Sequence, residues 1–109
     1  MAWSEKVDSI ISCGISLHDA GVSDWALTKE QALSAFDSIE KEKMFVLGGD
    51  VYQMVSGAPE SNYDNWYCDR NEGEDEGSYL ERCISKARQY VTQYQHPNGQ
   101  KAFFVLVVE

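Results

Sequence analysis

Basic residues are scarce in this chain: nine lysines and arginines face eighteen aspartates and glutamates, giving a formal net charge of -9. Nucleic-acid binding draws its affinity from cations placed on phosphates, and anionic membrane surfaces attract the same cations. The charge balance therefore argues against nucleic acid or a membrane as the direct ligand. It favours a basic protein partner, because opposite charges speed encounter, although solubility alone also accounts for an acidic surface.

Cysteine and long apolar runs are also scarce. Cys13, Cys68 and Cys83 form no CxxC pair and stand at no zinc-site spacing, so free buried thiols in a reducing cytoplasm are expected. The first residues lack the basic region of a signal peptide, and the longest apolar run, 102–108, has only the length of a strand. We therefore expect a cytoplasmic protein with no disulfide, metal or cofactor.

Side chains suited to catalysis are few. His18 and His96 fall in expected loops with no nucleophile beside them, and Cys83 falls on the apolar face of an expected helix. No glycine-rich phosphate loop, zinc motif or nucleophile elbow occurs. Gly48-Gly49-Asp50 offers one carboxylate, whereas calcium takes about six or more oxygens. The chain is therefore expected to bind a partner rather than to act as an enzyme.

Helical patterns occupy three parts of the sequence, which is expected to form one domain over 1–109. Apolar spacing predicts a first helix over 4–13. Thr28-Lys29-Glu30-Gln31 has the capping-box pattern at the start of a second helix over 29–43. A third helix is expected from Tyr79 to a stop at 96–99. Its apolar face is predicted to comprise Leu80, Cys83, Ile84, Ala87, Tyr90, Val91 and Tyr94.

Strand patterns occupy the middle and the end of the sequence. Apolar runs at 44–47 and 51–55 bracket two glycines, which fit either a hairpin turn or a bulge in one long strand; the bulge is favoured because 56–61 is a stronger turn. A return strand over 62–68 follows, and 102–108 is expected to be central with both faces covered. The order predicts an α+β fold, a small, mainly antiparallel sheet with about three helices packed on it.

Four carboxylates gather in an acidic loop expected over 69–78: Glu72, Glu74, Asp75 and Glu76. Acids just before a helix interact favourably with its dipole, which accounts for one or two of them. Carboxylates this close repel one another unless something cationic arrives. They are therefore the expected charged contact with a partner.

Two further residues are candidate partner contacts. Trp66 stands in the unusually aromatic segment 63–68, where it fits either a core position under a helix or an interface anchor. Asp50, beside the paired glycines, either caps a local turn or presents its carboxylate to a partner.

Three segments have the combined sequence pattern WALTKEQA at 25–32, VLGGDVY at 46–52 and YDNWYC at 63–68, and the pattern continues through 79–88 to 104–107. Together they resemble the immunity protein 40 family of bacterial polymorphic toxin systems of the contact-dependent growth-inhibition type. The resemblance implies a cytoplasmic inhibitor that is encoded beside a secreted toxin. Such an inhibitor neutralises the toxin domain by binding to it and catalyses no reaction. Many such toxins are nucleases with basic clefts, which an acidic inhibitor fits.

The resemblance supplies a role but no set of binding residues. The expected mode is non-covalent, partly electrostatic occlusion of a basic toxin domain by a protein that is a monomer when free. The residues leave open a second interpretation, a general acidic adaptor or regulatory module with an unrelated partner.

Overall fold

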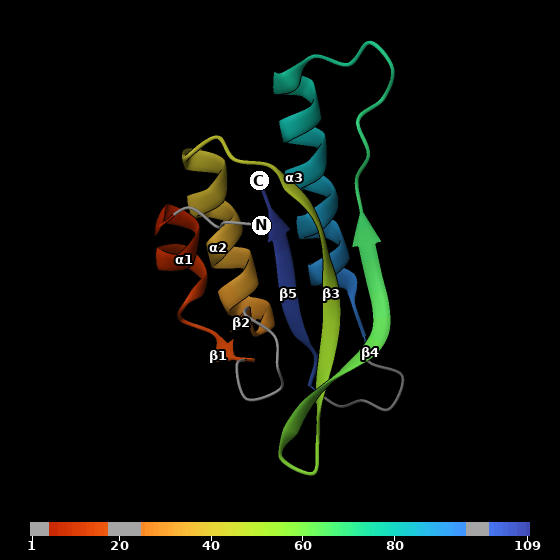
Figure 1. Ribbon diagram of the computed structural model, residues 1–109. Helices are drawn as coiled ribbons and strands as arrows, with labels where there is room; N and C mark the ends of the chain where they lie inside the picture. The colour runs from red at the N-terminus through yellow and green to blue at the C-terminus, as the bar shows by residue number, and fades with distance from the viewer. Residues whose placement is uncertain (1–4, 18–24, 96–100) are drawn as a thin grey trace.

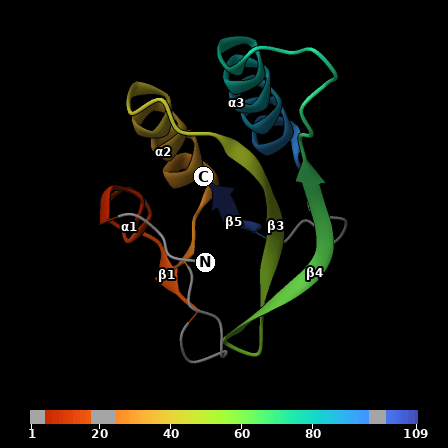
Figure 2. The ribbon, with the colours of Figure 1, turned by 45° about the horizontal axis from the view of Figure 1, so that its top comes forward.

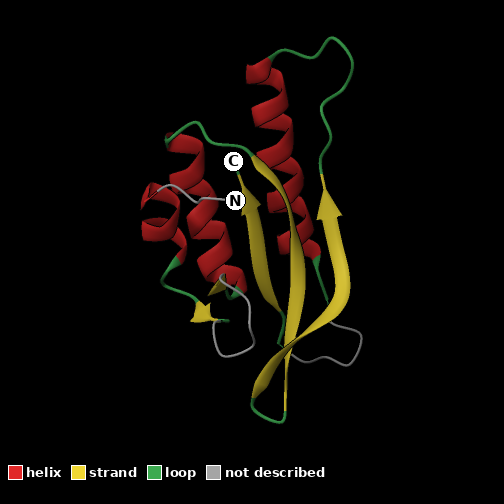
Figure 3. Ribbon diagram, in the orientation of Figure 1, coloured by secondary structure: helices red, strands yellow, loops and turns green. Residues whose placement is uncertain are grey.

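The structure is a computed structural model that describes residues 5–17, 25–95 and 101–109 (Figure 1). Its elements follow in the order α1 (Glu5–Ile11), β1 (Ile15–Ser16), β2 (Trp25–Ala26), α2 (Lys29–Lys41), β3 (Val46–Val55), β4 (Ala58–Tyr67), α3 (Glu76–Gln93) and β5 (Phe103–Val108). The long strands form an antiparallel sheet in the order β4-β3-β5, and β1 pairs with β2 in a separate ribbon (Figure 3). The predicted α+β class is confirmed.

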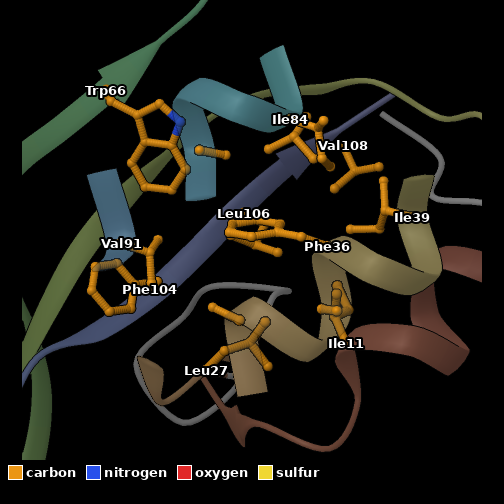
Figure 4. Close-up of a cluster of buried hydrophobic side chains, with 14 of the residues drawn as sticks. Ile11, Leu27, Phe36, Ile39, Trp66, Ile84, Val91, Phe104, Leu106 and Val108 are labelled. Carbon is orange, nitrogen blue, oxygen red and sulfur yellow. The ribbon is translucent and has the colours of Figure 1, made fainter. Parts of the chain in front are cut away.

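Helices α2 and α3 lie on one face of the sheet, and the core fills the space between them (Figures 1 and 2). Phe36 and Ile39 of α2 belong to the same buried cluster as Phe104 and Leu106 of β5, and all four are at most 1% exposed (Figure 4). The predicted apolar face of α3 is confirmed. Cys83, Ile84, Ala87 and Val91 are buried, while Leu80, Tyr90 and Tyr94 are partly buried.

The start of α2 has the predicted capping box. The Thr28 hydroxyl accepts a hydrogen bond from the Gln31 backbone N–H at 3.1 Å, and the Gln31 side-chain oxygen accepts one from the Thr28 N–H at 2.9 Å. The helix ends at Lys41, two residues before the predicted end, because Lys43 adopts a left-handed φ of 56°.

Helix α3 begins three residues earlier than predicted. Asp75 caps it, since its carboxylate accepts a hydrogen bond from the Ser78 N–H at 2.8 Å. Glu76 therefore belongs to the first turn of the helix rather than to the preceding loop. At its other end α3 stops at Gln93; the predicted stop signal at 96–99, with His96, lies outside the described residues, as does His18.

The hairpin between β3 and β4 turns more tightly than predicted. Val55 pairs with Ala58, so the loop is only Ser56-Gly57, and both residues have positive φ, 52° and 82°. Such two-residue turns match the twist of the flanking strands. The stretch 58–61 consequently belongs to β4 and not to the turn. The predicted continuity of β3 is confirmed, with register shifts against both neighbours.

The prediction that the C-terminal strand is central was wrong, because β3 lies between β4 and β5. Both faces of β5 are nevertheless covered. Phe104 and Leu106 face the helices, while Phe103 and Val105 pack with Leu17 and other residues of a second cluster. Strands β1 and β2 were not predicted, because two residues are too few to show alternation.

Gly49 makes room for a large ring on the neighbouring strand. A Cβ atom at Gly49 would lie 2.4 Å from Cη2 of Trp66 and 2.9 Å from the Val105 carbonyl oxygen. The Trp66 ring cannot easily move aside, because it stacks on Tyr90 of α3 with ring centres 4.7 Å apart. Close packing, rather than a special backbone conformation, is thus the reason for glycine at this position.

We predict that Gly49→Ala lowers the free energy of unfolding by about 1–3 kcal/mol, the usual effect of overpacking a dense core. Urea melts monitored by circular dichroism would measure it. The matched control is Gly77→Ala in the first turn of α3, where a Cβ meets only the Asp75 carboxylate at 3.5 Å. The control should be neutral or more stable by up to about 1 kcal/mol. Equal stability of Gly49→Ala and the native protein would show that the Trp66 ring does not pack there.

Candidate partner-binding surface

Glu74 forms an ion pair with Arg82 of α3. Its carboxylate accepts hydrogen bonds from Arg82 Nε at 2.9 Å and Nη2 at 2.7 Å, and another from the Asn71 N–H at 3.0 Å. The bonds from Arg82, and then the bond from Asn71, lower the pKa of Glu74 from the usual 4.5 to about 2. Arg82 also donates to the Asp69 carbonyl oxygen. The pair therefore closes the loop between β4 and α3.

The other three carboxylates of this loop have different surroundings. Asp75 is the cap of α3, whereas Glu72 and Glu76 are exposed and make no ion pair with another described residue. The structure thus divides the predicted acidic contact in two. Glu74 and Asp75 shape the loop, and Glu72 and Glu76 leave their charge open to solvent.

Trp66 lies in the core rather than at the surface. It is 5% exposed, and its ring projects from β4 into the core (Figure 4). The ring stacks on Tyr90 of α3. Its indole N–H is buried and has no hydrogen-bond acceptor among the described residues. The sequence allowed either a core position or an interface anchor for Trp66, and in the structure Trp66 occupies the core position.

Asp50 lies on the face of the sheet opposite the helices. Because Trp66 faces the helices, its neighbours Asn65 and Tyr67 face the other way. Asn65 pairs with Asp50 and Tyr67 pairs with Gly48, and paired residues share a face. Asp50 is exposed, and Tyr67 is 65% exposed. We call this side of β3 and β4 the outer sheet face.

A solvent-open hollow of about 380 Å³ lies on this face at the end of β4. Asp50, Asn65, Tyr67, Asp69 and Val107 are among the residues that line it. Gly48, which pairs with both Tyr67 and Val107, also lines the hollow, and a Cβ atom there would collide with the backbone of β4 at Trp66 and Tyr67. The hollow was not predicted. One signal in the sequence marks its position. In 65–67 a tryptophan that faces the core stands between two residues that face outward, and Gly48 pairs with the second of these.

The charge around the hollow is negative on balance. Residues 60–86 contain eight acidic and three basic residues. Of the three cations, Arg82 is paired with Glu74, Arg70 lies over the Tyr79 ring at 5.2 Å, and Lys86 donates to the Tyr67 carbonyl oxygen at 2.6 Å. No lysine or arginine lines the hollow, and Asp50 and Asp69 make no ion pair within the described part of the chain.

Few side chains elsewhere in the described residues are suited to act as a nucleophile or as a metal ligand. Cys68 and Cys83 are buried free thiols, and burial above all raises the pKa of Cys83 to about 12, which keeps it protonated. Cys13 is free but exposed, contrary to the expectation that all three thiols are buried. No group of three potential metal ligands occurs in the described ranges, and none of the helices described there is long and apolar enough to span a bilayer.

An acidic α+β fold with an open sheet face beside an acidic loop has the features of a small protein-binding module. The comparison with protein families is specific: the model for immunity protein 40 matches residues 16–108, nearly the whole chain. The chain therefore belongs to the immunity protein 40 family, as the sequence resemblance indicated. No curated protein and no solved structure matches it.

The Glu74–Arg82 pair predicts a pH-dependent stability. The folded-state pKa of Glu74 is lower than its unfolded value, so its stabilisation is complete above about pH 4.5 and disappears as the pH falls toward 2. Glu74→Gln should therefore be less stable than the native protein at pH 7 and approach it in stability at pH 2.5. Urea melts at both pH values measure the difference. Glu72→Gln, which removes an unpaired acid, is the control and should show no such convergence.

Proposed function

We propose that this protein is an immunity protein that binds one cognate toxin domain tightly and neutralises it by non-covalent, partly electrostatic occlusion, without catalysing a reaction. The family match over 16–108 is the observation that carries the proposal. The net charge of -9 supports it independently, because an acidic inhibitor fits a basic target. We further propose that the protein acts in the cytoplasm.

Glu72, Glu76 and Asp50 are proposed as the charged contacts. All three are exposed and form no ion pair with another residue that the structure describes, so their carboxylates are open to a partner. Glu74 and Asp75 contribute by fixing the loop that carries Glu72 and Glu76. Trp66 supports this surface from the core, because its packing on Tyr90 holds β4 against α3.

A nuclease is the proposed class of toxin. Nucleases bind phosphates with lysine and arginine, and the same cations would meet the carboxylates of this surface. The second candidate, a general acidic adaptor, shares the negative surface but requires no toxin. The gene beside this one separates the two: a large secreted protein with a variable C-terminal domain favours immunity, and a metabolic operon favours the adaptor.

We predict that this surface steers association with the toxin domain encoded beside it. Glu76→Lys should slow binding several-fold at low salt, and Glu72→Lys in the same chain should slow it further, because like charges repel at the contact. The native rate should fall with added salt, which screens charges over about 10 Å at 0.1 M. Stopped-flow fluorescence measures the rates, and co-expression in growing cells measures protection.

Glu30→Lys is the matched control. Glu30 is exposed in the first turn of α2, as Glu76 is in the first turn of α3, so both changes remove an acid from a helix start. The first turn of α3 lies at the top of the molecule in Figure 1, whereas that of α2 lies at the lower end of the helical layer. Glu30→Lys should leave the association rate nearly unchanged. Equal rates for both variants and for the native protein, at low and at high salt, would eliminate this acidic surface as the contact.

A further inference from the structure

Tyr63 combines a strained backbone conformation with an exposed side chain. Its φ is 69°, in the left-handed region that bulky side chains rarely adopt, and its side chain is 87% exposed. Burial cannot compensate for this conformation, because the ring is almost entirely in water. Strained residues of this kind concentrate at functional sites.

A bulge in β4 produces this conformation. Ser61 pairs with Tyr52 and Asn65 with Asp50, so that three residues, 62–64, lie opposite the single residue Val51. Bulges re-aim side chains at sheet edges, and β4 is at the edge of this sheet.

Tyr94, the residue that caps the end of α3, holds the bulge from both sides. Asn62 Nδ2 donates to the Tyr94 hydroxyl at 2.8 Å, and that hydroxyl donates to the Asp64 carboxylate at 2.5 Å. The Asp64 N–H also donates to Asn62 Oδ1 at 2.9 Å. Since the side chains on either side of Tyr63 both reach α3, Tyr63 itself is turned away from the helix.

None of these bonds uses the Tyr63 ring. Its N–H donates to the Ser61 hydroxyl at 3.1 Å, and its carbonyl oxygen accepts from Asn65 Nδ2 at 3.2 Å. Both are backbone groups that glycine would also provide, and glycine adopts a positive φ without strain. The network therefore accounts for a bulge at position 63 but not for a tyrosine there.

Charge complementarity indicates what the ring meets. Tyr63 precedes Asn65 and Tyr67 along β4, and both of these line the hollow. Asp50 and Asp69 line the hollow without an ion pair to another described residue, and none of the described lysines and arginines lines it. A second copy of this chain would bring a net charge of -9 against the same carboxylates. A partner that offers cationic side chains satisfies them, and tyrosine is a common anchor at protein interfaces.

We propose that Tyr63 is the aromatic anchor with which the outer sheet face docks on the cognate toxin domain, and that a lysine or arginine of the toxin enters the hollow beside Asp50. This inference rests on the proposed immunity function and specifies the surface that performs it. The acids at the start of α3 then extend the same contact beyond the end of β4.

Tyr63→Gly tests the anchor, because it removes the ring and relieves the backbone in one change. The variant should melt at the same temperature as the native protein or higher, while its Kd for the toxin domain rises about 30-fold or more, as for other interface tyrosines. Tyr63→Phe keeps the ring and should retain most of the affinity. Isothermal titration calorimetry and thermal melts supply the two readouts.

Ser56→Gly is the matched control, since Ser56 has a φ of 52° and is exposed at the tip of the same hairpin. It should relieve similar strain without changing the Kd. Asp50→Asn tests the hollow separately and should raise the Kd and weaken its salt dependence.

The outcomes separate this inference from the function beneath it. If the native protein does not bind the toxin domain, the proposed function fails. If the native protein binds and Tyr63→Gly binds equally well, the function stands and the anchor is overturned. A lower melting temperature for Tyr63→Gly would also overturn it, because the ring would then serve the fold.

Discussion

The packing of Trp66 across Gly49 and under Tyr90 is the contact on which the rest of the structure depends. It joins the central strand, the edge strand β4 and helix α3 at one point. Once Trp66 faces the helices, alternation along β4 places Asn65 and Tyr67 on the outer sheet face. The pairing register then adds Asp50 to that face. The position of the hollow thus follows from the core.

A second constraint acts where β4 leads into α3. The Glu74–Arg82 pair and the Asp75 cap fix the loop, which leaves Glu72 and Glu76 exposed and without an ion pair to another described residue. Figure 1 shows that this loop continues directly from the end of β4. The outer sheet face and the free acids Glu72 and Glu76 are therefore consecutive along the chain, and one partner can contact both.

The elements that local rules specify were predictable from the sequence. The capping box at Thr28 and the unbroken β3 are examples, because each depends on residues that adjoin in sequence. The start of α3 was missed because its cap, Asp75, stands among acids that the sequence analysis assigned together to a partner. The position of β5 in the sheet was predicted wrongly. A strand that is covered on both faces is uniformly apolar whether it is central or at the edge, so its sequence does not show its place in the sheet order.

The candidate site was predictable only in part. The acidic loop and Asp50 were identified from charge, but the division of the loop requires the contact between Glu74 and Arg82, which α3 brings together across eight positions. The core position of Trp66 was one of two interpretations that the sequence left open. The conformation of Tyr63 has no local signal, because it depends on Tyr94, some thirty residues further along the chain.

Amide hydrogen exchange of the protein, free and bound to its toxin domain, tests the central claim most directly. The outer edge of β4 has no partner strand in the described part of the chain, so its amides should exchange readily in the free protein. If the outer sheet face and the acidic loop form the contact, exchange should slow over 60–69 and 72–76 on binding and change little in α1 and α2. Slowed exchange confined to α1 and α2, with β4 and the loop unaffected, would contradict the account.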